Sequence, residues 1–164
     1  MIYLIGPMAS GKSTIGRSLA IALSTDFADT DAVITEAHGP IPQIFATHGE
    51  SYFRSLESQA LAQTRAGVIA TGGGIVVNPQ NHAALRRGTV IYLELSERTA
   101  QGRLPADDGR PLLSGDDRIA RWTQLYEQRR TTYEFLADLT VNVDDRSVDE
   151  VVALIEEHVI RTTR

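Results

Sequence analysis

The feature that most constrains this chain is a glycine-rich segment near its start, Gly6-x4-Gly11-Lys12-Ser13. It lies between a short apolar run at residues 3–5, typical of a buried strand, and a stretch at residues 13–23 whose apolar residues recur with helical spacing. Glycines allow consecutive backbone N–H groups to turn toward one point, and the start of a helix attracts anions. The pattern and its context therefore predict a phosphate-binding loop.

The residues inside this loop suit a nucleoside triphosphate such as ATP. Lys12 is the only lysine among 16 basic residues, and a lysine at this place in the pattern reaches the β- and γ-phosphates. Composition bias alone explains the abundance of arginine elsewhere, so only the position of Lys12 carries weight. The Ser13 hydroxyl is expected to bind Mg²⁺. We expect the nucleotide to be held by Ala9, Ser10, Gly11, Lys12, Ser13 and Thr14.

Length and composition narrow the class of protein. A chain of 164 residues can form one domain with a substantial core, and we expect a single domain over residues 1–164. The absence of cysteine excludes disulfides and zinc–thiolate sites. A net charge of −5 argues against binding to nucleic acid. The first apolar run is too short for a signal peptide or a membrane span. We therefore expect a cytoplasmic monomer with neither a nucleic-acid nor a membrane partner.

Short apolar runs alternate with amphipathic stretches along the whole chain. This alternation is typical of β-α-β units, in which parallel strands are joined by helices that cover the sheet. It predicts a three-layer α/β domain with five parallel strands. We expect strands at residues 3–5, 27–28, 68–70, 89–93 and 139–143, and helices at residues 13–23, 41–47, 51–65, 79–87, 116–137 and 147–160, with a short helix capped by Ser96.

Two carboxylates, Asp29 and Asp31, follow the second predicted strand in a stretch that we interpret as a loop. Ligands of open α/β sheets bind at the carboxyl ends of the strands, so both side chains could face one cavity. One could act on Mg²⁺ through water, and the other could accept a hydrogen bond from a substrate hydroxyl. The alternative is structural, with one aspartate capping a helix beside a solvated neighbour.

Two further segments could bind a substrate. Arg54 and Glu57 are three residues apart on a predicted helix, so the carboxylate could hold the guanidinium ready for a planar anion. An ordinary surface ion pair is the alternative. Gly72, Gly73 and Gly74 end a buried strand, where side-chain-free backbone permits close approach of a ligand. A plain loop is the alternative there.

A polar segment at residues 102–115, rich in proline, glycine, aspartate and arginine, is predicted to be a lid. Arg103 and Arg110 lie in it, and Arg129 and Arg130 follow on the next predicted helix. Transfer of a phosphoryl group requires positive charge that closes over the phosphates and excludes water. Because several aspartates lie alongside, a solvated loop is the alternative.

Six motifs in this order resemble the shikimate kinase family, and the resemblance covers nearly the whole chain. Gluconate and adenylate kinases share the first motif without the DxD, GE-x-x-FR-x-x-E and GGG series. The resemblance implies a nucleoside-monophosphate-kinase-like fold with strand order 2-3-1-4-5, and transfer of the ATP γ-phosphate, with Mg²⁺, to the 3-hydroxyl of shikimate. The motifs are GPMASGKSTIGR at 6–17, DTD at 29–31, IFATHGESYFRSLE at 44–57, TGGG at 71–74, GRPLL at 109–113 and the pair Arg129-x3-Tyr133.

On the acceptor side, the resemblance implies that Asp31 binds the substrate hydroxyls and assists their attack on the γ-phosphorus. Arg54 and Arg129 would clamp the substrate carboxylate, with Glu57 orienting Arg54. The three glycines at 72–74 would lie against the ring, Gly73 most directly. The acceptor-binding region would then span about residues 29–60.

On the nucleotide side, the resemblance implies that Asp29 lies near Mg²⁺. Lys12 and Arg110, the arginine of the lid, would reach the phosphates and act with Asp31 in catalysis. Arg103 would stack near adenine. Arg146 would also lie on the adenine side, although the chain lacks the proline that often follows this position in the family.

Two other functions stay open on the sequence. A kinase for another small hydroxylated acid, such as aminoshikimate or gluconate, could use the same arginines. A regulatory module that binds nucleotide without phosphoryl transfer would need only the phosphate loop, whereas this chain also carries Asp31 and the arginines of the acceptor side.

Overall fold

The computed structural model describes residues 1–104, 111–113 and 117–162, and these form a parallel sheet covered by helices on both faces. The sheet has five strands in the order β2-β3-β1-β4-β5, which confirms the predicted number of strands and the order implied by the resemblance. In the register, Ile2 pairs with Val68 on one side and with Thr89 on the other. The strands are β1 (Ile2–Ile5), β2 (Phe27–Asp29), β3 (Val68–Ala70), β4 (Thr89–Glu94) and β5 (Leu139–Asn142).

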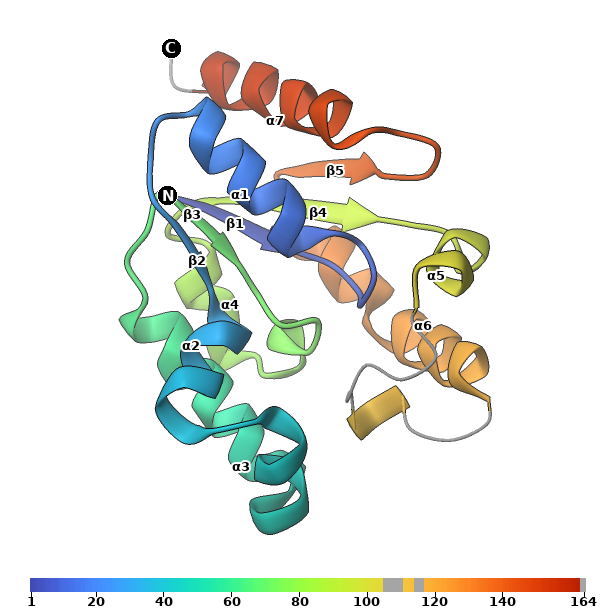
Figure 1. Cartoon of the computed structure of the whole chain (residues 1–164). Coiled ribbons are helices and arrows are strands. Elements are labelled where there is room, and N and C mark those ends of the chain that lie inside the picture. The colour runs from blue at the N-terminus through green and yellow to red at the C-terminus, as the bar shows by residue number, and fades with distance from the viewer. Residues whose placement is uncertain (105–110, 114–116, 163–164) are drawn as a thin grey trace.

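Helices α1 and α7 cover one face of the sheet, whereas α3, α4 and α6 cover the other (Figure 1). No helix in the described part of the chain combines the length and apolar character needed to cross a membrane. The α-helices are α1 (Lys12–Ala22), α2 (Thr30–His38), α3 (Ile41–Gln63), α4 (Gln80–Leu85), α5 (Glu97–Arg103), α6 (Arg118–Leu136) and α7 (Val148–Thr162), and two short 3-10 helices are η1 (Ile75–Val77) and η2 (Pro111–Leu113).

The central strand β1 is apolar throughout because both of its faces are buried. Ile2 and Leu4 point toward the layer of α1 and α7, while Tyr3 and Ile5 point toward the layer of α3, α4 and α6. A third, smaller core joins α2 to α3 apart from the sheet. Its buried members are Ile34, Ile44, Phe53, Leu56 and Ala60. Helices α2 and α3 are therefore packed against each other by a core separate from that of the sheet.

Helix α2 was not predicted, and the interpretation of Asp29 and Asp31 as loop residues is wrong. Asp29 caps the helix, because its side chain accepts hydrogen bonds from the backbone N–H groups of Asp31 and Ala32. Asp31 lies in the first turn of α2. The structural alternative therefore holds for Asp29, although both carboxylates still lie at the carboxyl edge of the sheet.

Helix α3 contains the interruption that the sequence predicted between residues 48 and 50. Gly49 has φ 80° and ψ 174°, outside the helical region, so α3 consists of two helical segments that meet at a kink there, as predicted. The cap at Ser96 is confirmed, since its side chain accepts a hydrogen bond from the Thr99 N–H. In the segment predicted as a lid, the structure describes the end of α5 and η2, while residues 105–110 and 114–116 lie outside the described part.

Candidate active site

The phosphate loop turns tightly between β1 and α1. Gly6 has φ 143°, and a Cβ atom there would lie 2.5 Å from the Leu93 carbonyl oxygen, so the backbone can run this close to β4 only without a side chain. Ala9 and Gly11 also have positive φ, at 69° and 86°. The Lys12 ammonium donates hydrogen bonds to the Gly6 carbonyl at 2.9 Å and to the Pro7 carbonyl at 2.8 Å. The lysine thus folds back over the loop and places its charge at the loop's centre.

Side chains from distant segments hold the loop from outside. The indole N–H of Trp122, on α6, donates to the Met8 carbonyl oxygen at 2.9 Å. Arg103, at the end of α5, donates to the carbonyls of Ala9 at 3.4 Å and Val143 at 3.2 Å. Trp122 is 1% exposed, so its ring is fixed in the core while its N–H reaches the loop. The role of Trp122 was not foreseen from the sequence.

Ser13 and Asp29 meet where α1 and β2 approach one another. The Ser13 hydroxyl donates to an oxygen of the Asp29 carboxylate. The hydroxyl and carboxylate oxygens are the hard ligands that Mg²⁺ prefers, and Mg²⁺ usually takes one or two such protein groups together with phosphate and water. The donor set at this position therefore fits the predicted metal.

An arginine between two carboxylates forms the acceptor side of the site. Arg54 donates from Nη1 to Glu57 at 2.5 Å, and from Nη2 and Nε to Glu50 at 3.0 and 3.3 Å. Glu57 is 1% exposed, whereas Glu50 lies at the surface. The Arg54–Glu57 pair is therefore largely buried, and the alternative interpretation as a surface ion pair is wrong. Glu50 as a second partner of Arg54 was missed.

The glycines after β3 pack directly against these charged groups. A Cβ atom on Gly72 would lie 2.6 Å from Glu57 Oε1 and 2.7 Å from Asp31 Oδ1. A Cβ atom on Gly74 would overlap the guanidinium of Arg54. The absence of side chains at Gly72 and Gly74 is therefore what allows the carboxylates and the guanidinium to reach the edge of the sheet.

Arg129 approaches the same glycines from α6. It is 8% exposed, and its Nη1 donates to the Gly73 carbonyl at 3.5 Å. Tyr133, one turn further along α6, donates its hydroxyl to the same carbonyl. The neighbouring Arg130 points away from the site, where it pairs with Glu134. The helical spacing thus brings Arg129 and Tyr133 inward together.

These groups line one cavity of about 670 Å³, which runs from the phosphate loop to the acceptor side. Ser10 is not among its lining residues, because this residue of the loop is fully buried. Arg146 is not among them either, and it donates to the Asn142 carbonyl. Arg110 lies outside the described residues. The predicted site residues that line the cavity are Ala9, Gly11, Lys12, Ser13, Thr14, Asp29, Asp31, Arg54, Gly72, Gly73, Gly74, Arg103 and Arg129.

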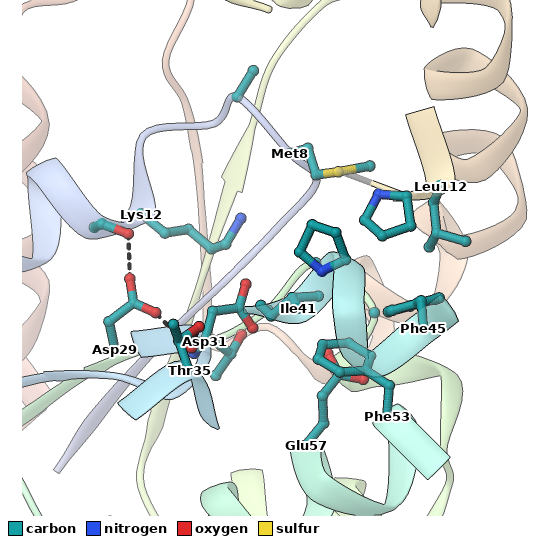
Figure 2. Close-up of a pocket in the computed structure, with 18 of the residues that line it drawn as sticks. Met8, Lys12, Asp29, Asp31, Thr35, Ile41, Phe45, Phe53, Glu57 and Leu112 are labelled. Carbon is teal, nitrogen blue, oxygen red and sulfur yellow. Dashed lines mark hydrogen bonds between the residues drawn. The ribbon is translucent and has the colours of Figure 1, made fainter. Parts of the chain in front are cut away.

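The cavity also has an apolar wall, which sequence reasoning missed. Figure 2 shows Met8, Leu112 and Phe45 facing the space in front of Lys12 and Asp31. Ile41, Pro42 and Phe53 complete this wall. The rings of Phe45 and Phe53 lie 4.8 Å apart across the bend in α3. An apolar wall facing charged groups suits a small ligand that has a hydrocarbon ring and polar substituents.

Burial raises the pKa of Glu57 from 4.5 to about 6, against the opposing effect of the Arg54 charge. Because the pKa is higher in the folded than in the unfolded chain, protonation of Glu57 favours folding. This contribution is complete below pH 4.5 and is lost as the pH rises through 6. Between pH 5 and 7.5 we expect Glu57 to lower the free energy of unfolding by about 1 kcal/mol.

This prediction can be checked by urea unfolding of the wild type and of Glu57→Gln at both pH values. Glutamine keeps the size of the side chain and one acceptor for Arg54 but cannot titrate. The wild type should lose about 1 kcal/mol more than the variant between pH 5 and 7.5. Equal losses would show that Glu57 does not titrate in this range.

Comparison with known proteins identifies the family. The family model described as shikimate kinase matches residues 8–160. A shikimate kinase of a Synechococcus strain is 47% identical over 155 residues, covering 92% of this chain and 79% of the relative. A shikimate kinase of Vibrio cholerae is 41% identical over 168 residues, covering 97% of both chains. The solved structure of shikimate kinase from Acinetobacter baumannii in complex with shikimate is 33% identical, with a TM-score of 0.94, and the match covers 98% of this chain and 93% of that one. The chain belongs to the shikimate kinase family.

Proposed function

We propose that this protein transfers the γ-phosphate of ATP to the 3-hydroxyl of shikimate, giving shikimate 3-phosphate and ADP. The observation that carries the proposal is the single cavity in which a phosphate loop faces Asp31, Arg54 and Arg129. Membership of the family and the similarity to a relative solved with shikimate support the choice of acceptor.

On the nucleotide side, the backbone N–H groups of residues 9–14 would bind the phosphates, with Lys12 neutralising charge on the transferred group. Ser13 and Asp29 would hold Mg²⁺, which when bound supplies charge that stabilises the phosphate oxygens. Arg103 would lie beside the nucleotide, because it lines the cavity and already contacts the loop at Ala9. Arg146 donates a hydrogen bond to the Asn142 carbonyl at the end of β5. It would contact the adenine only from outside the cavity.

On the acceptor side, shikimate is a small anion with three hydroxyls on a carbon ring. Arg54 and Arg129 would bind its carboxylate through charge-assisted hydrogen bonds. Asp31 would accept a hydrogen bond from the attacking hydroxyl and orient its oxygen toward the γ-phosphorus. The new bond forms between that oxygen and phosphorus as the bond to ADP breaks, and the hydroxyl proton passes to the Asp31 carboxylate or to a phosphoryl oxygen. Because the transition state of phosphoryl transfer is loose, this orientation supplies much of what the reaction requires.

The organisation of the chain follows from the same proposal. A single domain would carry an acceptor-binding region at about residues 29–60, which corresponds to α2 and most of α3 with their own small core. Residues 102–115, including Arg110, would form a lid over the phosphates. We further propose that the protein acts as a cytoplasmic monomer on small molecules, without nucleic-acid or membrane partners.

An assay of ADP release with purified protein, MgATP and a panel of acceptors tests the function. We expect turnover with shikimate, weaker turnover with an analogue that lacks the ring carboxylate, and none with gluconate. ATP binding measured by calorimetry serves as the control for folded protein. Normal ATP binding with only background turnover of shikimate would refute the proposal.

Gly74→Ala should impair use of shikimate selectively. The added methyl group would displace the Arg54 guanidinium, which overlaps the position of a Cβ atom there. We expect KM for shikimate to rise about 10- to 100-fold, the value of one lost charge-assisted hydrogen bond, with KM for ATP nearly unchanged.

A double-mutant cycle with Arg54→Ala isolates this cause. If the clash acts through Arg54, Gly74→Ala should add little to the defect of Arg54→Ala. Fully additive defects would mean that the methyl group acts on something other than Arg54.

A further inference from the structure

One buried tyrosine contacts the loop of Gly72, Gly73 and Gly74, the acceptor loop. The proposed chemistry assigns this tyrosine no role. Tyr133 is fully buried on α6, and its hydroxyl donates to the carbonyl oxygen of Gly73, 60 residues away in the chain. Arg129 donates to the same oxygen at 3.5 Å. The Gly73 carbonyl is therefore held from the side of α6 by two side chains one helical turn apart.

The tyrosine is a permanent donor in a fixed position. Burial raises the pKa of Tyr133 to about 12, although the Arg129 charge opposes the shift, so the hydroxyl keeps its proton at physiological pH. Its ring stacks on that of Tyr92 with centroids 5.2 Å apart. Tyr92 belongs to β4, and its own hydroxyl pairs with that of Tyr126 at 2.9 Å. The Tyr133 ring is thus fixed from the sheet as well as from its helix.

Holding the Gly73 carbonyl fixes the next N–H group. The peptide unit between Gly73 and Gly74 is planar and trans, so its C=O and N–H point in opposite directions. With the carbonyl drawn toward α6, the Gly74 N–H must face away from that helix. Both glycines line the cavity, and Gly74 lies against the Arg54 guanidinium. The orientation of this peptide therefore determines where the Gly74 N–H group lies relative to Arg54.

The same loop sets the distance between the two halves of the site. A Cβ atom on Gly73 would lie 3.4 Å from the Gly6 carbonyl oxygen and 3.5 Å from the Met8 nitrogen, both in the phosphate loop. The space between the acceptor loop and the phosphate loop at Gly73 is thus no wider than one methyl group. A shift of Gly73 toward or away from α6 would change this separation, on which in-line transfer depends.

We propose that Tyr133 is a positioning residue for the acceptor: its hydroxyl fixes the peptide between Gly73 and Gly74, and so orients the acceptor relative to the phosphate loop. The proposal rests on the function proposed above. The proposal predicts different effects on the two substrates, because the tyrosine holds the acceptor loop and not the phosphate loop. Loss of its hydroxyl should accordingly affect the acceptor and not ATP.

Tyr133→Phe tests this by removing only the hydroxyl from the stacked ring. Tyr126→Phe is the matched control, since it removes another tyrosine hydroxyl from the same helix, one whose partner is Tyr92. We expect KM for shikimate to rise about tenfold in Tyr133→Phe, with KM for ATP changed less than about twofold. Tyr126→Phe should leave both KM values within about twofold of the wild type.

A second readout does not depend on turnover. In ¹⁵N-labelled protein, the Gly74 amide resonance should move in Tyr133→Phe and stay in place in Tyr126→Phe, because only the first releases the Gly73 carbonyl. A lowered melting temperature with unchanged KM values and an unmoved Gly74 resonance would overturn the proposal, leaving Tyr133 a structural role. Equal increases in both KM values would also overturn it.

The two proposals fail in different ways. If the wild type does not phosphorylate shikimate, the proposed function falls, and the Gly74 resonance still decides whether Tyr133 fixes the loop. If the wild type turns over shikimate and Tyr133→Phe matches Tyr126→Phe in KM and in the spectrum, only the role of Tyr133 falls.

Discussion

Lys12→Ala should reduce kcat by about a thousandfold. The ammonium lies over the phosphate loop, held by the carbonyls of Gly6 and Pro7, where it can follow the charge of the transferred phosphoryl group. Loss of one preorganised charged donor at such a site typically costs two to three orders of magnitude or more in rate. Single-turnover measurements of ADP formation at saturating ATP separate this loss of rate from weaker nucleotide binding.

Lys12→Arg is the informative companion, because the chain uses arginine for all its other basic residues. It keeps the positive charge, but a planar guanidinium is too large to occupy the place of an ammonium between two backbone carbonyls. We expect activity close to that of Lys12→Ala. Activity of Lys12→Ala within about tenfold of the wild type would contradict the role assigned to the lysine.

Arg129→Ala should lower kcat/KM for shikimate by about 100- to 1000-fold, with most of the loss in KM. Arg129 is almost fully buried, so its removal takes away a charged donor for the substrate carboxylate and leaves that anion poorly paired inside the cavity. It also removes one of the two donors to the Gly73 carbonyl. Steady-state kinetics with shikimate and ATP varied in turn will measure both parts.

Arg130→Ala is the matched control for this prediction. The residue is adjacent on α6, but its side chain is 55% exposed and pairs with Glu134 and Glu94 at the surface. Its removal should change kcat/KM by less than about threefold, because exposed ion pairs contribute little. Similar defects in the two variants would show that the loss arises from the net charge of α6 and not from a contact within the cavity.

Local patterns allowed most of the sheet and of the phosphate loop to be predicted. The strand, the loop and the helix follow one another directly in the sequence, so the motif of Gly6, Gly11 and Lys12 could be recognised together with its two flanking elements. The strands are short, but β1, β3 and β4 are mainly apolar, buried runs bounded by turns or helices. The strand order came from the resemblance, since nothing in an isolated strand states which neighbour it pairs with.

Helix α2 was missed because its sequence gives a weak helical signal. Thr30–His38 is short and includes the β-branched residues Val33, Ile34 and Thr35, which disfavour helix intrinsically. Only Thr30 and Ile34 are buried, so no apolar stripe marks the helix. Its stability derives from the Asp29 cap and from packing on α3, and the second of these cannot be seen in the local sequence.

The site was predicted where one residue type carries the chemistry and missed where contacts alone create it. Arg54 and Arg129 are recognisable as charged residues in a motif. In contrast, the apolar wall joins Met8, Phe45 and Leu112 from three distant segments, and no spacing relates them. The hydrogen bond of Trp122 to the phosphate loop is of the same kind, since it joins residues 114 positions apart.

That hydrogen bond gives the protein a built-in optical probe. Trp122 is the only tryptophan in the chain, and its indole is buried, stacked on Tyr126 and bonded to the backbone of the loop that contains Lys12. Its emission therefore originates from one place, at the back of the phosphate loop. Nucleotide arrival could be followed in real time by stopped-flow fluorescence of the unlabelled protein, and shikimate added alone would serve as the reference signal.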